Sequence, residues 1–291
     1  MPASQPGEIL LGDNLELLPA FPDGSFQLIY IDPPFNTGRS QTRRTLAVVG
    51  DSEGERTGFA GRRYRARVIG ESSYADGFAD YRAFLAPRLE QAHRLLAREG
   101  TLYLHLDYRE SHRCKLLLDE IFGEACFLNE LVWAYDYGAR SRRRWPAKHD
   151  TILVYVRDPR AYHFDAEEVD REPYMAPGLV TPEKAARGKL PTDVWWHTIV
   201  PTNGREKTGY PTQKPEGIVR RMVLASTRPG DRCLDFFAGS GTLGAVAAAT
   251  GRRYVLIDSN PEAVRVMERR LGHTAVAPAP PVARAGRHRG A

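Results

Sequence analysis

The chain has 291 residues, of which 42% are hydrophobic and 26% are charged, and its formal net charge is +5. No stretch approaches the roughly 20 apolar residues that a membrane helix needs, and no basic start followed by an apolar run marks a signal peptide. The three cysteines lie far apart with no histidine at ligand spacing, which argues against a metal site or a disulfide framework and favours the cytoplasm.

Short apolar runs alternate with amphipathic segments along most of the chain. Strands are expected at 8–12, 26–31, 102–106, 127–135, 151–156, 233–236 and 254–257. Helices are expected at 15–20, 81–98, 110–122, 215–227, 242–250 and 261–271. Strands that alternate with helices in this way predict an α/β fold with a doubly wound, mostly parallel sheet.

Three segments depart from this alternation. Residues 39–71 are polar and rich in glycine and arginine, so we expect a long basic loop. Residues 161–210 are irregular and contain Trp195 and Trp196, which indicates an insertion rather than part of the sheet core. Residues 273–291 consist largely of alanine, proline and arginine and predict a disordered tail.

Positive charge is concentrated in two places. Residues 39–67 hold eight arginines and three acidic residues, and residues 138–148 hold four arginines, one lysine and no acidic residue. Such clusters favour contact with a polyanion such as nucleic acid, with solvated surface loops as the alternative. In the second cluster the candidate DNA contacts are Arg140, Arg142, Arg143, Arg144 and Lys148.

The first special motif, Asp32-Pro33-Pro34-Phe35, follows the apolar run 26–31 and suits an amino-group substrate. An exocyclic amine of a nucleobase is a weak nucleophile, and two acceptors on its N–H groups would hold it ready to attack a methyl group. Asp32 can supply a carboxylate oxygen, and the successive prolines keep the carbonyl of Pro33 rigid. Phe35 offers a ring for stacking a base. Fixed acceptors also stabilise the amine as it becomes cationic.

The second special motif is Phe-Ala-Gly-Ser-Gly-Thr at 237–242, which follows the apolar run 233–236. Its glycines let the backbone approach a ligand, and Asp258, at the end of the next expected strand, can accept hydrogen bonds from ribose hydroxyls. A nicotinamide dinucleotide is one interpretation. The chain after Asp258 is too short for the second half of a dinucleotide fold, so S-adenosylmethionine fits better. The remaining strands must then come from the N-terminal part, which predicts a circularly permuted sheet.

These motifs resemble those of the amino-group DNA methyltransferases, in the β arrangement that places the catalytic motif before the cofactor motif. The matching stretches are Gly-Asp-Asn at 12–14, Leu-Ile-Tyr-Ile-Asp-Pro-Pro-Phe-Asn-Thr-Gly at 28–38, Leu-Asp-Glu-Ile-Phe-Gly at 118–123, Pro-Thr-Gln-Lys-Pro-Glu at 211–216 and Leu-Asp-Phe-Phe-Ala-Gly-Ser-Gly-Thr at 234–242. The resemblance covers roughly residues 8–157 and 210–272.

The resemblance implies roles for individual residues. The catalytic residues that hold a base flipped out of the duplex would be Asp32, Pro33, Pro34 and Phe35. The residues around S-adenosylmethionine would be Thr212, Lys214, Asp235, Phe237, Ala238, Gly239, Ser240, Gly241, Thr242 and Asp258. Asp13 is a further cofactor candidate, and a helix N-cap is an equal alternative for it.

The resemblance also implies a division of the chain. Residues 1–160 would form the catalytic half, with the basic loop at 39–71, and residues 211–272 the cofactor-binding half. Residues 161–210 would be an inserted target-recognition region in which the tryptophans either belong to the core or contact DNA. The tail at 273–291 would follow.

The resemblance leaves more than one reaction open. Asp as the first residue of the tetrad indicates that N6 of adenine is methylated. The alternative is N4 of cytosine, because family members that methylate this atom more often have Ser at that position. A methyltransferase for glutamine amides in proteins would more typically have Asn there, with the glycine motif upstream. An intact Asp32 speaks against a DNA-binding subunit without turnover. Double-stranded DNA is the expected partner, and a homodimer and a cognate restriction endonuclease stay open.

Overall fold

The computed structural model describes residues 7–36, 39–50, 56–57, 63–201 and 203–276. The chain divides into two compact units, one formed by Pro34–Tyr81 and the other by Met1–Pro33 together with Arg82–Ala291. Among the described residues, the larger unit contains a sheet of eight strands and the smaller unit a sheet of three.

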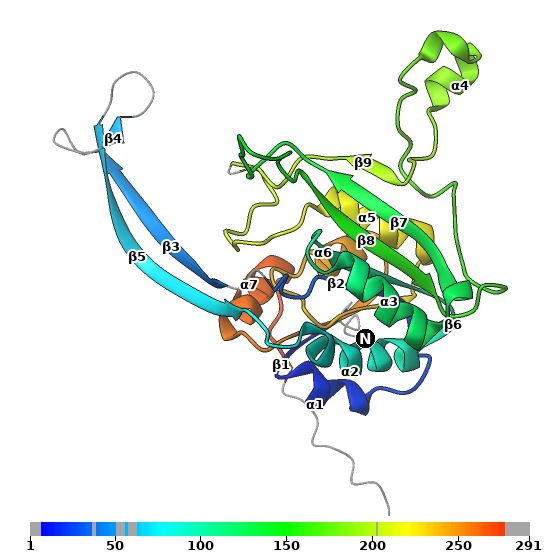
Figure 1. The fold of residues 1–291 in the computed structure, drawn as a ribbon, viewed down its shortest axis with the longest axis horizontal. Coiled ribbons are helices and arrows are strands. Elements are labelled where there is room, and N and C mark those ends of the chain that lie inside the picture. Colours follow the sequence, from blue (N-terminus) through cyan, green and yellow to red (C-terminus); the bar gives the residue numbers. More distant parts are fainter. Residues whose placement is uncertain (1–6, 37–38, 51–55, 58–62, 202, 277–291) are drawn as a thin grey trace, which may run out of the picture. The chain divides into compact units, whose positions relative to one another are not determined.

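The main sheet has the strand order β1-β11-β10-β2-β6-β8-β7-β9 (Figure 1). The bounds of its strands are β1 (Gly7–Leu11), β2 (Phe26–Ile31), β6 (Leu96–Leu106), β7 (Phe127–Ala134), β8 (His149–Val156), β9 (Val194–Trp196), β10 (Arg232–Asp235) and β11 (Arg253–Asp258). The first five strands in this order pair in parallel, β8 is antiparallel to both of its neighbours, and β7 pairs in parallel with β9. The predicted α/β fold with a mostly parallel sheet is therefore confirmed.

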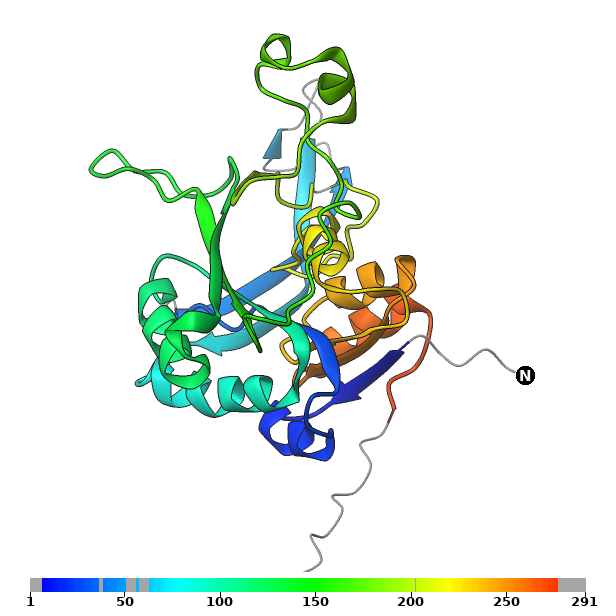
Figure 2. The same cartoon turned by 90° about the vertical axis from the view of Figure 1, so that its right-hand side faces the viewer.

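Helices cover both faces of this sheet. The helices are α1 (Asn14–Leu17), α2 (Tyr81–Leu95), α3 (Ser111–Phe122), α4 (Pro182–Arg187), α5 (Glu216–Ser226), α6 (Thr242–Ala249) and α7 (Pro261–Leu271), and short 3-10 turns lie at Leu18–Ala20, Glu124–Cys126 and Pro177–Leu179. Figure 2 shows α2 and α3 on one face and α5, α6 and α7 on the other. The second group buries Met222, Leu243 and Met267 in one apolar cluster with side chains of the sheet. Parallel strands need such cover on both faces.

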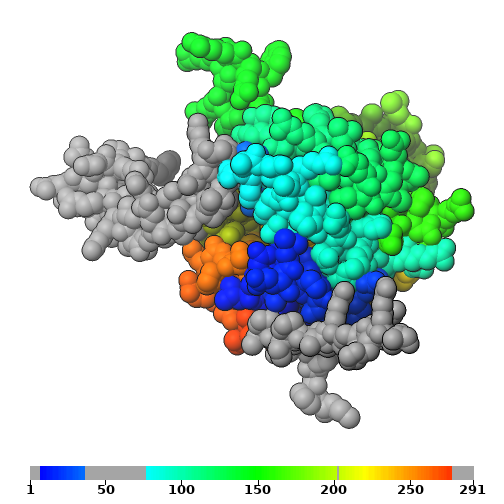
Figure 3. Space-filling view, turned by 60° about the horizontal axis from the view of Figure 1, so that its bottom comes forward, coloured from blue at the N-terminus to red at the C-terminus, as the bar shows by residue number. Residues whose placement is uncertain are grey.

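Strands from opposite ends of the sequence lie side by side in the middle of the sheet. β10 and β11 lie between β1 and β2. In the space-filling view the surface of the N-terminal segment, in blue, adjoins that of the C-terminal segment, in orange (Figure 3). The predicted circular permutation is confirmed, because the N-terminal part of the chain supplies the strands that the C-terminal part lacks.

The basic segment at 39–71 is not the loop that its composition predicts. β3 (Arg39–Gly50) pairs antiparallel with β5 (Arg63–Asp76), and the short β4 (Arg56–Thr57) also pairs with β5. The high arginine content indicates a loop, but charged and apolar residues alternate in this segment, as in Arg-Tyr-Arg-Ala-Arg-Val at 63–68. Alternation of this kind favours a strand even where the polar positions are charged.

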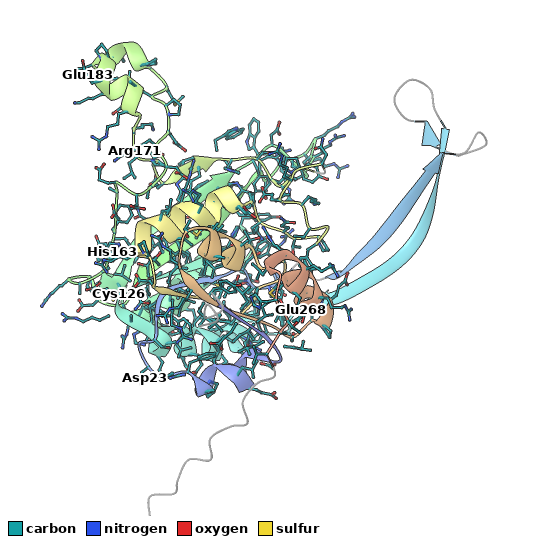
Figure 4. All side chains as sticks on the ribbon, turned by 180° about the vertical axis from the view of Figure 1, so that it is seen from behind. Asp23, Cys126, His163, Arg171, Glu183 and Glu268 are labelled. Carbon is teal, nitrogen blue, oxygen red and sulfur yellow. The ribbon has the colours of Figure 1, made fainter. Side chains whose placement is uncertain are left out.

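The segment 161–210 also differs from its prediction, because part of it joins the main sheet. β9 pairs with the end of β7, where Trp195 is buried and Trp196 is 73% exposed. The lobe that carries α4 stands out from the sheet, and Figure 4 labels Arg171 and Glu183 in it. A strand of three residues is too short to give a periodic signal in the sequence.

The chain after α7 returns to the first strand. The backbone N–H of Val276 donates to the carbonyl of Ile9 at 2.9 Å, and the rest of the predicted tail, 277–291, lies outside the described residues. The three cysteines are buried free thiols. No helix within the described ranges has the length and apolar character needed to cross a bilayer.

Candidate active site

The two special loops leave the sheet from neighbouring strands at the same edge. β2 and β10 pair in parallel, with Leu28 opposite Cys233 and Ile29 opposite Leu234. Asp32 directly follows β2, and the glycine-rich turn directly follows β10. The chain continues from β10 to β11 on one side and from β2 to β6 on the other. This reversal is the topological switch point at which open α/β sheets bind their ligands.

Asp32 lies at this switch point with its two carboxylate oxygens in different environments. Its Oδ2 accepts a hydrogen bond from Nζ of Lys214, and the two side chains are 16% and 11% exposed. Its Oδ1 is buried and has no hydrogen-bond partner among the described residues. A buried acceptor of this kind favours a donor group on a ligand, because leaving it unpaired costs free energy.

Hydrogen bonds fix the backbone of Lys214 against the glycine-rich turn. The hydroxyl of Thr242 donates to the carbonyl of Lys214 at 3.1 Å. Arg270 of α7 donates to the carbonyl of Ser240 at 3.1 Å and forms a 2.6 Å ion pair with Glu216, two residues beyond Lys214. The segment before α5 and the turn after β10 are therefore held as one piece.

The glycine-rich turn has the backbone conformation that its sequence predicts. Gly239 and Gly241 have φ of +50° and +72°, which favours glycine. A Cβ on Gly241 would lie 2.8 Å from a side-chain carbon of Met267, so close packing also demands a glycine there. The N–H of Gly239 donates to Oδ2 of Asp258 at 2.8 Å, which joins the turn to the end of β11. Burial raises the pKa of the Asp258 carboxyl.

Several predicted cofactor residues lie beneath the surface of the turn. Ala238, Ser240 and Thr242 are buried, whereas Phe237 and Gly239 are partly exposed. Asp235 is buried as well, and its Oδ1 accepts a 3.0 Å hydrogen bond from the N–H of Phe237. Burial raises the pKa of Asp235 well above its ordinary value, and the charge of Asp32 raises it further.

Two further candidates, Asp13 and Thr212, have other surroundings. Asp13 caps α1 by accepting from the N–H of Leu15 at 2.8 Å, which is the alternative that its position allowed. Thr212 is exposed, while its neighbour Gln213 is buried and accepts from the N–H of Thr208 at 2.9 Å. Pro33 is buried beside Asp32, and Pro34 and Phe35 belong to the smaller unit.

Sequence reasoning missed a contact between the N-terminal segment and the glycine-rich turn. Asn14 donates to the carbonyl of Phe236 at 2.9 Å, and the guanidinium of Arg88 donates to Asn14 at 2.8 Å. Arg88 also lies 4.1 Å from the centre of the Phe84 ring, which is 6.0 Å from the ring of Phe237. Burial lowers the pKa of Arg88. The sequence feature that could have indicated this contact is an arginine on the otherwise apolar face of α2.

A buried polar chain also escaped prediction. His105 lies between Tyr30 and Asp150, at 3.0 and 3.1 Å, and Tyr135 donates to the other oxygen of Asp150 at 3.0 Å. These four residues stand on β2, β6, β8 and just after β7, near the edge that carries Asp32. Burial and then the charge of Asp32 raise the pKa of Tyr30. The sequence feature that could have indicated this polar chain is a histidine inside the apolar run 102–106.

The predicted DNA contacts lie on the loop between β7 and β8. Its exposed arginines are Arg140, Arg142, Arg143 and Arg144. Lys148 at the base of the loop forms a 3.2 Å ion pair with Asp136. No cluster of three or more metal-binding side chains occurs within the described part of the chain.

The sequence of this chain is similar to those of known DNA methyltransferases. The model of the DNA methylase family, N6_N4_Mtase, matches residues 26–269. The DNA adenine methyltransferase YhdJ of Escherichia coli is 31% identical over 271 residues, covering 90% of this chain and 82% of YhdJ. The type II methyltransferase M.HpaI of Haemophilus parainfluenzae is 27% identical, covering 90% and 73%.

Solved structures show the same fold. The M1.HpyAVI–SAM complex has a TM-score of 0.58 at 19% identity, covering 91% of this chain and 98% of the other. The PvuII DNA methyltransferase, described as cytosine-N4-specific, has a TM-score of 0.60 at 15% identity, covering 92% and 94%. At these identities the likeness concerns the fold alone.

Proposed function

Because this chain belongs to the DNA methylase family and is an S-adenosylmethionine-dependent DNA amino-methyltransferase, we propose that the amine it methylates is N6 of adenine, presented by a base extruded from the duplex. The observation that carries the proposal is Asp32, with a buried Oδ1 that lacks a partner among the described residues, at the switch point beside the glycine-rich turn. The Asp at the start of the tetrad and the similarity to an adenine methyltransferase favour adenine over cytosine.

The residues of the glycine-rich turn fit a nucleoside cofactor without phosphate. Arg270, a cation beside the turn, donates to the carbonyl of Ser240 and forms an ion pair with Glu216, so its guanidinium already has partners other than a phosphate. Asp258 is partly exposed and lies at the end of β11, where an acidic residue can accept hydrogen bonds from a ribose. In this proposal Asp258, Phe237 and Gly239 hold the cofactor, which supplies an electrophilic methyl group on a sulfonium.

The chain's own residues then act on the amine. Oδ1 of Asp32 accepts one N–H of the base, and the rigid carbonyl of Pro33 accepts the other. These two acceptors aim the nitrogen lone pair and stabilise the positive charge that develops on it. Lys214 holds Oδ2 of Asp32, so that Oδ1 stays directed to the amine. By the resemblance to the family, Phe35 is the candidate for stacking on the extruded base.

The division of the chain remains part of the proposal. The halves 1–160 and 211–272 would hold the base and the cofactor, and the exposed lobe of 161–210 would contribute to target recognition. The cytoplasmic location is also part of the proposal, and the three free thiols support it. A homodimer and a cognate restriction endonuclease stay predictions from the sequence.

The methylated base tests the proposal directly. The purified chain is incubated with unmethylated DNA of mixed sequence and S-adenosylmethionine carrying a deuterated methyl group, and the DNA is digested to nucleosides for mass spectrometry. We expect label in N6-methyldeoxyadenosine, and none with the Asp32→Ala variant. Label in N4-methyldeoxycytidine would overturn the adenine assignment. The absence of label in both nucleosides would contradict methyltransferase activity of the chain. Sequencing the modified DNA then gives the target site.

A further inference from the structure

The loop between β7 and β8 (135–148) leaves the sheet at the edge that carries Asp32. Ala134 at the end of β7 pairs with His149 at the start of β8, and β8 is antiparallel to β6, which is parallel to β2. The loop and Asp32 therefore follow strand ends on the same side. Three strand spacings of roughly 4.8 Å, about 14 Å in all, separate β2 from β7. Figure 2 shows the loop standing out from this end of the sheet.

The loop presents an indole to solvent among unpaired cations. Trp145 is 95% exposed and directly follows Arg142-Arg143-Arg144. Within the described ranges, none of the loop's four arginines forms an ion pair with an acidic side chain. A single exposed apolar side chain is common and needs no explanation. An exposed indole beside three free guanidinium groups, at the edge where the chemistry takes place, is the combination that single-stranded or distorted nucleic acid requires.

The loop has internal hydrogen bonds at its base and just before the indole. At its base the N–H of Tyr135 donates to the carbonyl of Lys148 at 2.9 Å. Further out, the hydroxyl of Ser141 accepts from the N–H groups of Arg143 and Arg144, each at 3.1 Å. Pro146 disfavours a helical conformation for Trp145. These restraints reduce the entropy that ordering the loop on DNA would cost.

We propose that Trp145 enters the duplex when the target base is extruded and occupies the space that the base leaves. This inference rests on the proposed function, because it needs a base that leaves the stack. Extrusion breaks stacking on both sides of the target, and an indole in the gap restores part of that stacking. The arginines hold the flanking phosphates, which places the indole at the gap. Trp145 is thus a positioning residue for the reaction, since it does not touch the reacting atoms.

Two duplexes containing the mapped target site separate this role from simple DNA binding. In one, the target adenine is paired with thymine, and in the other it faces an abasic site, so that no base pair has to be broken and extrusion is easier. Single-turnover methyl transfer is measured on both for the wild type, Trp145→Ala and Trp145→Phe. A duplex with 2-aminopurine at the target position reports extrusion by its fluorescence, independently of methyl transfer.

We expect Trp145→Ala to slow transfer to the paired duplex by about 5- to 150-fold, the range that base–aromatic stacking supports. On the abasic duplex its rate should stay within about twofold of the wild type, because extrusion without a base pair to break no longer limits transfer. Trp145→Phe should retain most of the rate on both. The 2-aminopurine signal of Trp145→Ala should fall in parallel with the loss on the paired duplex.

Two variants serve as controls. Arg143→Ala should weaken binding to both duplexes alike, because a phosphate contact does not depend on the base opposite the target. Leu116→Ala replaces another exposed apolar side chain, 63% exposed on α3, and should change neither rate.

Two results would overturn the proposal for Trp145. One is a wild-type rate for Trp145→Ala on the paired duplex, and the other is an equal loss on both duplexes, which would assign Trp145 to binding alone. If the wild type neither methylates the paired site nor raises the 2-aminopurine signal, the proposed function fails and the proposal for Trp145 fails with it.

Discussion

Lys214 and Asp32, which are 182 residues apart in the sequence, form a largely buried ion pair between Nζ and Oδ2. The contact joins the end of β2 to the segment before α5, which is itself tied to the glycine-rich turn through Thr242. Removing one partner of a buried pair leaves the other charge uncompensated, which typically costs about 3–5 kcal/mol. The pair therefore fixes the carboxylate that the proposed reaction needs.

Lys214→Met should slow single-turnover methyl transfer by about tenfold or more, a loss of about 1.4 kcal/mol of transition-state stabilisation. Lys214→Arg keeps the charge and should be milder. The measurement is the single-turnover rate of both variants at one pH, and a wild-type rate for Lys214→Met would show that the ion pair has no part in the reaction.

Asp235→Asn should stabilise the protein near neutral pH and have little effect near pH 4. Burial raises the folded-state pKa of Asp235, so the unfolded chain releases this proton first. Stability is then lost as pH rises above the ordinary Asp pKa of about 3.9, by about 1.4 kcal/mol for each unit between the two pKa values. The Asn amide can still accept from Phe237.

Urea unfolding of wild type and Asp235→Asn between pH 4 and pH 7 measures this difference in the free energy of unfolding. The gap should widen in favour of the variant as pH rises. A gap that does not change with pH would mean that Asp235 titrates alike in the folded and unfolded chains.

Replacing Arg142, Arg143 and Arg144 together with alanine should weaken DNA binding and flatten its dependence on salt. Each phosphate contact that is lost should reduce the slope of log K against log salt by about 0.9. Fluorescence anisotropy on one duplex at several salt concentrations gives this slope. Arg113→Ala, an 80% exposed arginine on α3, is the control that should leave the slope unchanged. An unaltered slope in the triple variant would assign the cluster to solvent.

Asp258→Ala should weaken binding of S-adenosylmethionine by about ten- to a hundredfold, as expected for loss of charge-assisted hydrogen bonds to a ribose. Its carboxylate also holds the N–H of Gly239, so the turn loses a support as well. Calorimetric titration measures the affinity. Asp231→Ala, at the opposite end of β10, should bind like the wild type. Equal affinity in Asp258→Ala would remove this residue from the cofactor site.

The centre of the fold could be predicted from the sequence because each strand there is a short apolar run ended by a distinctive turn. β2 has the predicted bounds, Phe26–Ile31, and α7 the predicted bounds, Pro261–Leu271. The loops that follow β2 and β10 were recognisable because proline and glycine restrict or widen backbone conformation in known ways.

Other parts of the site depend on contacts that no local pattern contains. The hydrogen bonds from Arg88 to Asn14 and from Asn14 to Phe236 join residues 74 and 222 positions apart. The chain through His105 crosses four strands, and each of its members is a single polar residue in or beside an apolar run. The pairing of β3 with β5 was not predicted for a different reason. The many charged residues of this segment indicate a loop, although they alternate with apolar residues as in a strand.

The most direct test measures cofactor binding and methyl transfer in the same Asp32→Ala preparation. If the ends of β2 and β10 share one site with separate tasks, the variant should bind S-adenosylmethionine within about threefold of the wild-type affinity. The same preparation should transfer methyl groups at least a hundredfold more slowly, an order of magnitude typical for loss of a fixed polar group at a developing charge. Transfer at the wild-type rate would contradict the central role given to this carboxylate.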